Sequence, residues 1–309
     1  MITSVFSKSK PVNYILITSL LVLCFFLYQL ARPEWMESGR GIAEKTVILL
    51  VLVASLFMVN FITKKNGLSK DNSFAFFLFF IFLILFPRIL NDTNIVLSNF
   101  FILLSLRRMV SLQSLVTPKE KIFDASLWIF IAALFHFWSI LFIILVFISI
   151  IFHVAGDYRN WIIPFIAFFA VFTIYILAGL VFDKTLITGL FHKAVFDFDL
   201  NYFKNSFQNI ALGLYVVLAV LFVLGQVFSL PNKPLNLHAS YKKFIFFFII
   251  GVVIFLISPN KSNSLLAFTF APLCVMGANF IELLHKYWMK ETVIGIVLLL
   301  TIFTFISQL

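Results

Sequence analysis

The chain has 309 residues, of which 62% are hydrophobic and only 12% are charged, and its mean hydropathy is +1.08. An ordinary soluble domain carries about 25% charged residues, so the composition excludes a water-soluble globular protein. The net charge of +10 does not indicate nucleic-acid binding, because the basic residues are spread between apolar segments, as in membrane proteins that follow the positive-inside rule. We therefore predict one integral membrane domain with short loops.

The first apolar segment, Tyr14–Ala31, follows a basic start and is followed directly by RPEW. No small-residue cleavage site follows it, so we expect an uncleaved first membrane span. About 20 apolar residues cross a bilayer, and further apolar segments of roughly that length recur along the chain. The further predicted spans are Thr46–Thr63, Ser73–Phe86, Ile95–Leu115, Trp161–Phe182, Ile210–Leu230, Phe244–Ser258, Leu265–Leu284 and Thr292–Leu309.

A longer apolar segment, Ala125–Val154, does not fit a single ordinary span of about 20 residues. His136 lies near its middle, and we predict a hairpin of two short helices, Phe123–Phe135 and Trp138–His153, that turns around this histidine. The charge pattern supports the hairpin. With the N-terminus inside, fifteen of the 23 Lys and Arg fall in inside segments, which gives +9 inside and +1 outside. If this segment were a single span, every later loop would lie on the opposite side of the membrane.

The predicted fold class is therefore all-α, a polytopic integral membrane protein of about eleven membrane helices in one domain over residues 1–309. We expect an N-terminal module of seven helices over 1–182, an outer loop over 183–208, and four C-terminal helices over 209–309. The two cysteines fall inside apolar segments, so no disulfide framework is predicted.

The outer loop 183–208 contains apolar residues at helical spacing, which predicts an interfacial helix in the plane of the membrane. These residues are Phe191, Val195, Phe198 and Tyr202. The same loop holds Asp197 and Asp199, a DxD pair of the kind that binds divalent metal in nucleotide-sugar enzymes. On a helix these two positions point about 200° apart, so we favour an ordinary helix surface here.

The loop Arg32–Lys45, RPEWMESGRGIAEK, carries three acidic and three basic residues between the first two spans. Glu34 and Glu37 are three residues apart and would share one face of a helical turn. Such a pair is suited to deprotonate an acceptor hydroxyl or to hold a metal, while Arg32 and Arg40 are suited to bind a phosphate bidentately. The alternative is a solvated loop anchored by an interfacial tryptophan.

Four further positions are candidates for substrate or phosphate binding. Asp92 and Arg88 lie in the second outer loop and are expected to meet the first loop, or else to form a surface pair. His136 is an ionisable group at membrane depth, and Lys261 lies in a tight turn where it is placed to meet an anionic group. The alternatives are a histidine hydrogen-bonded at a helix turn and an ordinary turn lysine. Arg107–Arg108 is expected either to snorkel or to bind lipid phosphate.

The sequence contains no P-loop, HExxH, GxSxG, zinc-ligand or haem motif. No cofactor is required by its motifs, and a divalent metal remains an open possibility.

The segments MITSVFSKSKPVNY and LSNFFILLSLRRMVSLQS resemble an uncharacterised family of polytopic inner-membrane proteins from Bacteroidota. In addition, the acidic first loop, the hairpin FDASLWIFIAALFHFWSILFIILVFISI and the late turn ISPNKSNSLLAFTFAPL resemble GT-C glycosyltransferases. The second resemblance implies a GT-C-like fold in which residues 1–182 form the GT-C-like module. It implies an integral enzyme that takes sugars from polyprenyl-phosphate donors. It also implies that Glu34 or Glu37 is a catalytic base or metal ligand, and that Lys261 lies near the donor phosphate.

We therefore expect a bacterial inner-membrane protein, N-terminus cytoplasmic and C-terminus periplasmic, that acts on a polyprenyl-phosphate-linked sugar or glycan at the outer face. Its expected partners are membrane lipids and, in a second reading, another membrane protein, with no nucleic acid. That second reading is a non-catalytic subunit that binds lipid or a partner's transmembrane helix. A third is a lipid or solute transporter, which the lack of a visible inverted repeat disfavours.

Overall fold

The computed structural model describes residues 2–182, 194–198, 206–259, 261–284 and 286–309, and within these the chain is helical without β-strands. The helices of the first half are α1 (Ile2–Phe6), α2 (Pro11–Leu30), η1 (Pro33–Glu37), α3 (Gly39–Lys65), α4 (Phe74–Leu85), η2 (Pro87–Asn91), α5 (Thr93–Ser111), η3 (Leu112–Ser114) and α6 (Pro118–Phe135). Those of the second half are η4 (Phe137–Phe142), α7 (Ile143–His153), α8 (Arg159–Val181), α10 (Ser206–Ser229), η5 (Leu230–Asn232), α11 (Leu235–Ile257), η6 (Asn263–Leu266), α12 (Ala267–Leu283) and α13 (Tyr287–Ile306).

Each predicted span coincides with a helix, although several helices extend further than their apolar segments. Eight helices in the described part are long and apolar enough to cross a membrane. The helix α4 and the continuous segment of η4 and α7 are apolar but shorter. The all-helical class is thus confirmed together with eight candidate spans, and the count of about eleven membrane helices stays a prediction.

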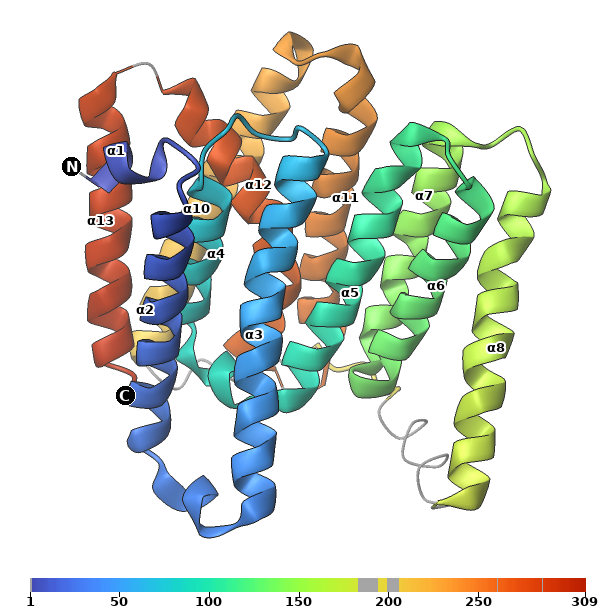
Figure 1. Cartoon of the computed structure of the whole chain (residues 1–309), viewed down its shortest axis with the longest axis horizontal. Helices are drawn as coiled ribbons and strands as arrows, with labels where there is room; N and C mark the ends of the chain where they lie inside the picture. The colour runs from blue at the N-terminus through green and yellow to red at the C-terminus, as the bar shows by residue number, and fades with distance from the viewer. Residues whose placement is uncertain (1, 183–193, 199–205, 260, 285) are drawn as a thin grey trace.

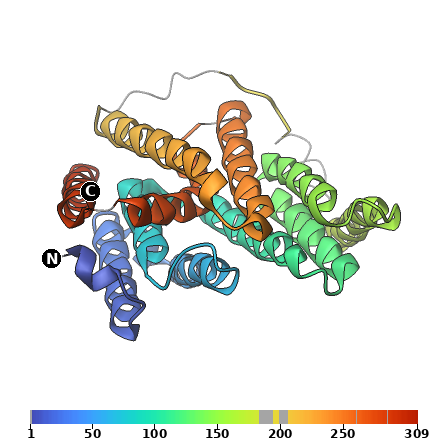
Figure 2. The same ribbon diagram turned by 90° about the horizontal axis from the view of Figure 1, so that it is seen from above.

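The two helices α4 and α12 form the centre of the bundle. Every residue of α4, FAFFLFFIFLIL, is buried. In the helical segment Asn263–Leu283, which contains α12, 94% of the most apolar stretch is buried. A helix that is hydrophobic on all sides is expected to be enclosed by others, and Figure 2 shows α10, α11, α13, α2 and α3 grouped around this pair. Gly277 of α12 permits the close packing, because a Cβ there would lie 2.6 Å from the Phe222 ring and 2.7 Å from Leu78.

The predicted hairpin around His136 is confirmed. The backbone at His136 is extended (φ −133°, ψ 106°), which ends α6 before η4 and α7 return beside it. Two serines of α5 hold the hairpin: Ser98 hydrogen-bonds the Ser139 hydroxyl (2.7 Å), and Ser105 donates to the Ala125 carbonyl (2.8 Å). Small residues and hydroxyl hydrogen bonds of this kind allow close helix packing inside a membrane.

Two expectations about loops are wrong. The loop expected between the predicted spans Ile210–Leu230 and Phe244–Ser258 is shorter than predicted, because α11 already begins at Leu235 and carries Lys243 into the bundle. The helix expected in the outer loop is also not formed at 194–198, which has no regular secondary structure. That segment is held by hydrogen bonds to neighbouring elements and not by its own helical ones. Residues 183–193 and 199–205, including Asp199, lie outside the described residues.

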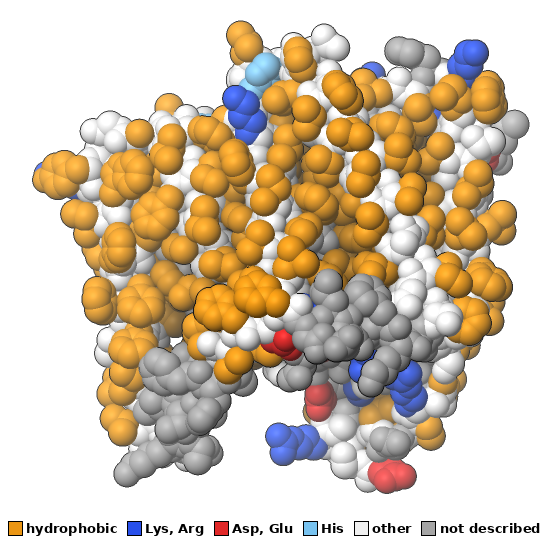
Figure 3. All heavy atoms as spheres, turned by 180° about the vertical axis from the view of Figure 1, so that it is seen from behind, with side chains coloured by type: hydrophobic (Ala, Val, Ile, Leu, Met, Phe, Trp, Pro, Cys, Tyr) orange, Lys and Arg blue, Asp and Glu red, His pale blue; other side chains and the backbone are white. Residues whose placement is uncertain are grey.

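Successive helices run in opposite directions, so the connections between them lie at two opposite ends of the bundle (Figure 1). The amino end contains α1 and the connections at 66–73, 112–117, 154–158 and 230–234. The carboxy end contains η1, η2, η4, η6 and the chain's C-terminus. Hydrophobic side chains cover the middle of the face in Figure 3, whereas charged side chains gather toward its two ends. A surface that faces lipid between two aqueous layers is expected to show this distribution.

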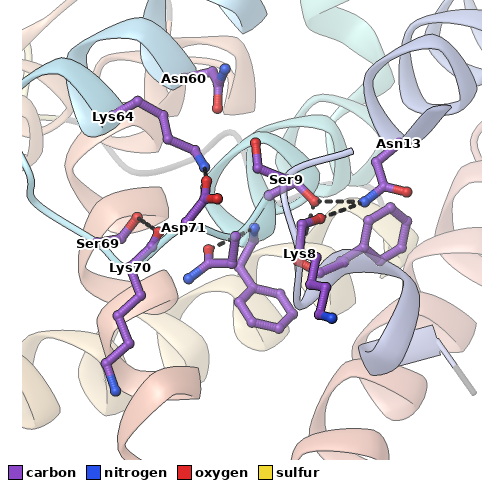
Figure 4. Close-up of polar contacts among 12 residues, drawn as sticks. Lys8, Ser9, Asn13, Asn60, Lys64, Ser69, Lys70 and Asp71 are labelled. Carbon is purple, nitrogen blue, oxygen red and sulfur yellow. Dashed lines mark hydrogen bonds and ion pairs between the residues drawn. The ribbon is translucent and has the colours of Figure 1, made fainter. Parts of the chain in front are cut away.

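At the amino end, α1 is fastened by polar contacts to α2 and to the connection before α4 (Figure 4). The Asn13 amide donates to the carbonyls of Val5 (2.7 Å) and Lys8 (2.9 Å). The Lys64 and Asp71 side chains point toward each other and lie 2.5 Å apart, and this contact lowers the pKa of the Asp71 carboxyl. The segment before the first span, for which no helix was predicted, is therefore part of the folded unit.

Candidate functional site

The turn between α2 and α3 is fixed by contacts with the last turn of α2. The Trp35 indole donates to the Gln29 carbonyl (3.2 Å), and Arg32 donates to the Tyr28 hydroxyl (2.6 Å) while its guanidinium stacks 4.7 Å from that ring. The Gln29 amide reaches the Leu90 carbonyl in η2 (3.0 Å). Arg32, predicted to bind phosphate, is thus held by Tyr28 in the last turn of α2.

The start of α3 lies earlier than predicted, so the first loop is shorter. Ser38 caps the helix by accepting a hydrogen bond from Gly41 N (3.0 Å). Gly41 is needed there because a Cβ would lie 2.5 Å from the Trp35 carbonyl oxygen. Arg40 therefore stands in the first helical turn, and Glu44 follows one turn later on the same face.

The second outer loop is formed by η2 and the cap of α5. Pro87 starts the short helix, and the Asp92 carboxylate accepts a hydrogen bond from Ile95 N (3.3 Å), which caps α5. Burial raises the pKa of Asp92, although the Ile95 N–H and the Arg88 charge act in the opposite direction. The carboxyl group is thus partly desolvated and poised to hold a proton more readily than an ordinary aspartate.

These two loops meet around a shallow pocket of about 710 Å³, which we call the carboxy-end pocket. Side-chain hydrogen bonds cross from one loop to the other, from Lys45 to Asn91 and from Thr93 to Glu44. These contacts fix α3 against η2 and α5. The pocket is lined by Arg40, Ala43, Glu44, Val47, Arg88, Asn91, Asp92, Thr93 and Asn94.

The pocket combines two guanidinium groups with two carboxyl groups. Among the described residues, no carboxylate lies at ion-pair distance from Arg40 or Arg88, and both side chains are exposed. Guanidinium groups bind phosphate oxygens through paired hydrogen bonds, and a partly desolvated carboxyl group can accept or return a proton. The arrangement is chemically suited to hold a phosphate beside a proton-accepting group.

Of the predicted catalytic pair, Glu37 does not line this pocket. Glu34 and Glu37 both belong to η1, where residues three apart in a 3₁₀-helix share a face. Glu37 is exposed, and the Glu34 side chain lies outside what the structure describes. Their catalytic role stays a prediction, and the carboxyl groups in the pocket belong to Glu44 and Asp92.

His136 takes part in a second polar cluster at the same end. Its Nε2 lies 3.1 Å from the Ser258 hydroxyl at the end of α11, and its ring lies 5.5 Å from the Phe268 ring. Trp138 donates to the Val195 carbonyl (3.2 Å), and its ring packs against the Phe196 ring with centres 4.3 Å apart and planes tilted by 45°. The hairpin turn is therefore packed against the end of α11 and against residues 194–198.

Lys261, predicted to meet a donor phosphate, is buried, with 7% of its surface exposed. Its ammonium donates to the Asp197 carbonyl and lies 3.9 Å from the Asp197 carboxylate. The backbone N–H of Asp197 in turn donates to the Ile257 carbonyl (3.1 Å). In this arrangement Lys261 fastens the segment 194–198 to the turn between α11 and α12.

Of the predicted site residues, the structure brings together Arg40, Arg88 and Asp92. His136 and Lys261 stand at the same end but do not line the pocket, even though η2 lies against η6. Sequence reasoning missed Glu44 and Thr93. The i, i+4 spacing from Arg40 to Glu44 was a signal for the first, once α3 is known to begin at Gly39.

In the described part of the chain, no three His, Cys, Asp or Glu side chains gather in a manner suited to hold a metal ion. The possible divalent metal stays a prediction.

The family model for a family of unknown function (DUF6427) matches residues 1–309, the whole chain. The chain belongs to this family. No curated protein and no solved structure matches it. The predicted membership of an uncharacterised family is thus supported. The source in Bacteroidota and the GT-C resemblance stay predictions.

Proposed function

We propose that this DUF6427 member is a GT-C-like membrane protein that binds, and acts on, a polyprenyl-phosphate-linked sugar or glycan at the carboxy-end pocket. The observation that carries the proposal is the convergence of Arg40 from α3 and Arg88 from η2 on one pocket. Neither has a carboxylate at ion-pair distance among the described residues. Two such cations are suited to a phosphate that bridges lipid and sugar.

The proposal includes about eleven membrane helices in a bacterial inner membrane, with the N-terminus cytoplasmic and the C-terminus periplasmic. Its support is the charge distribution: the segments at the amino end contain fifteen of the 23 Lys and Arg. The carboxy-end pocket then opens on the periplasmic face, where polyprenyl-linked sugars are donors in GT-C chemistry.

For glycosyl transfer, the acceptor hydroxyl gives its proton to a carboxylate as its oxygen bonds to the anomeric carbon of the donor. The bond from that carbon to the phosphate oxygen breaks, and polyprenyl phosphate leaves with the electron pair. Arg40 and Arg88 stabilise the charge that develops on the phosphate. The carboxylate is supplied by Asp92 or Glu44 of the pocket, or by Glu34 or Glu37 of the adjoining turn.

Binding is tested on the purified full-length protein by mass spectrometry of its copurifying lipids. We expect a polyprenyl-phosphate sugar with the wild type and about a fivefold or greater loss for Arg40→Gln with Arg88→Gln, since each charge near the surface contributes about 1 kcal/mol. The matched control is Lys10→Gln with Lys242→Gln, which removes two exposed charges at the other end. Equal lipid content in both double variants would refute the proposal.

A second candidate, a non-catalytic membrane subunit, is favoured by the exposed position of Glu37 outside the pocket. Two double variants, Glu34→Gln with Glu37→Gln and Glu44→Gln with Asp92→Asn, are assayed for transfer of labelled sugar from a polyprenyl-phosphate donor. Loss of transfer in either pair, with lipid still bound, supports the enzyme. Retained lipid binding without any carboxylate-dependent transfer supports the subunit.

A further inference from the structure

We propose that a pocket at the amino end, opposite the carboxy-end pocket, binds a phosphate group supplied by an anionic lipid headgroup or by a small phosphorylated solute. This amino-end pocket lies between the ends of α3 and α5 and the beginnings of α6 and α11, with a volume of about 650 Å³. That volume is within the range of small-ligand sites. Its charged lining residues are all basic: Lys65, Arg107, Arg108 and Lys121.

Two of these cations share one aromatic ring. The Arg107 guanidinium carbon lies 4.8 Å from the centre of the Phe61 ring, and the Lys65 ammonium lies 5.1 Å from it. Each cation gains from the ring's quadrupole, but two like charges beside one ring repel one another. In the part of the chain that is described, neither has a carboxylate at ion-pair distance. Since both side chains line the pocket, an anion bound there would offset this repulsion.

The other two cations are fixed by the protein. Lys121 is 8% exposed, and its ammonium donates to the Ser111 carbonyl (2.9 Å) and the Ser114 hydroxyl (2.7 Å). An ammonium group has three N–H donors, so one remains for a ligand. Arg108 pairs with Asp124 at 2.8 Å. This carboxylate offsets one of the four positive charges, which leaves about three for an anion to neutralise.

The cations of the amino-end pocket are not arranged like lysines that snorkel separately to the membrane interface. Surface lysines that snorkel extend separately into water, as exposed Lys10 and Lys242 do. Here cations from α3, α5 and α6 converge on one hollow, and Lys121 is buried in its wall. Basic pockets between transmembrane helices at a membrane face are suited to phosphate-bearing headgroups. The apolar Phe61 and Leu237 also line the pocket, where they would meet the less polar part of a lipid.

The test uses the full-length protein in an uncharged maltoside detergent and native mass spectrometry. The protein is titrated separately with dihexanoyl phosphatidylglycerol, with dihexanoyl phosphatidylcholine and with inorganic phosphate. We expect an anionic probe to bind the wild type and binding to weaken at least about fivefold in Lys65→Gln with Arg107→Gln. The control Lys8→Gln with Lys10→Gln removes the same charge from exposed positions at the same end and should bind like the wild type.

The probes separate the two sources of phosphate. Binding of phosphatidylglycerol but not of inorganic phosphate assigns a lipid headgroup, and equal binding of both assigns a soluble phosphorylated ligand. If the double variant fails to fold, Lys65→Gln alone serves, because that exposed side chain contacts only the pocket's phenylalanine among the interactions described. The proposal is overturned if neither anionic probe binds, if phosphatidylcholine binds equally well, or if the pocket variant and the control behave alike.

Discussion

The Gln29 amide nitrogen donates a hydrogen bond to the Leu90 carbonyl at 3.0 Å, although 61 residues separate them. Both residues are buried, and the Gln29 carbonyl accepts the hydrogen bond of the Trp35 indole. One residue at the end of α2 thus positions both outer loops. We expect this contact to help position Arg40 and Arg88 around the carboxy-end pocket, because Arg40 directly follows the first loop in α3 and Arg88 lies in the second.

Gln29→Ala should lower the free energy of unfolding by about 1–3 kcal/mol, because the buried Leu90 carbonyl loses its partner. The measurement is thermal or denaturant unfolding in detergent, together with the content of copurified lipid. Ser19→Ala is the control on the same helix, since that exposed hydroxyl bonds only to the Leu16 carbonyl within its own helix. A loss no larger than the control's would show that the two loops are positioned by other contacts.

Asp92→Asn should stabilise the protein at neutral pH. Burial raises the pKa of Asp92 above its ordinary value of 3.8, so the folded state resists ionisation, and wild-type stability falls as the pH rises through the raised pKa. Asparagine is a good helix cap and carries no charge. The stability difference between variant and wild type should therefore be largest near pH 7, shrink as the pH falls through the raised pKa, and become constant below the ordinary pKa of 3.8. The measurement is the unfolding midpoint of both proteins across that pH range. A stability difference that grows toward low pH would contradict a raised pKa of Asp92.

Gly277→Ala should destabilise the bundle by about 1–3 kcal/mol, because the new methyl group would overlap the Phe222 ring and Leu78 in a packed core. Gly213→Ala on α10 is the matched control. No atom lies within 4 Å of a Cβ there, and alanine favours a helix by about 1 kcal/mol over glycine. Melting temperatures of the two variants should thus move in opposite directions. A tolerated Gly277→Ala would mean that α4, α10 and α12 separate easily.

Lys243→Met should cost about 1.5–3 kcal/mol, the value of a hydrogen bond from a charged group. The fully buried Lys243 ammonium donates to the Met109 carbonyl (2.7 Å) and lies 3.2 Å from Nε2 of His153. Met109 is in the last turn of α5, where carbonyls lack helical partners. The neighbouring exposed lysine provides the control Lys242→Met, expected to change stability by less than about 0.5 kcal/mol. Equal effects of the two changes in denaturant unfolding would exclude this capping role.

Much of the fold could be predicted because hydropathy acts locally. A helix in lipid must satisfy its own backbone hydrogen bonds over a continuous apolar segment, so each such segment predicts a helix wherever it packs. The break at His136 was predictable for the same reason, since the apolar segment around it is too long for one span. The start of α11 was missed because Leu235–Lys243 is polar in sequence, while its lysine finds partners in α5 and α7.

The site was predictable only in part, since it depends on rotations and contacts between helices. Charge and spacing indicated Arg40, Arg88 and Asp92, and the structure places them around one pocket. They could not indicate that Lys261 would be fastened to Asp197, a residue 64 positions earlier. Nor could they show that Lys65 and Arg107 share the Phe61 ring.

The sequence by itself determined that the chain is a set of apolar helices with basic residues concentrated in alternate connections, because both properties are fixed by the transfer of side chains from water to lipid. Only the tertiary structure decided which charged groups face one another, which lysines are buried and where the two pockets open. Those outcomes follow from long-range packing and hydrogen bonding, whose partners the local pattern of residues does not specify.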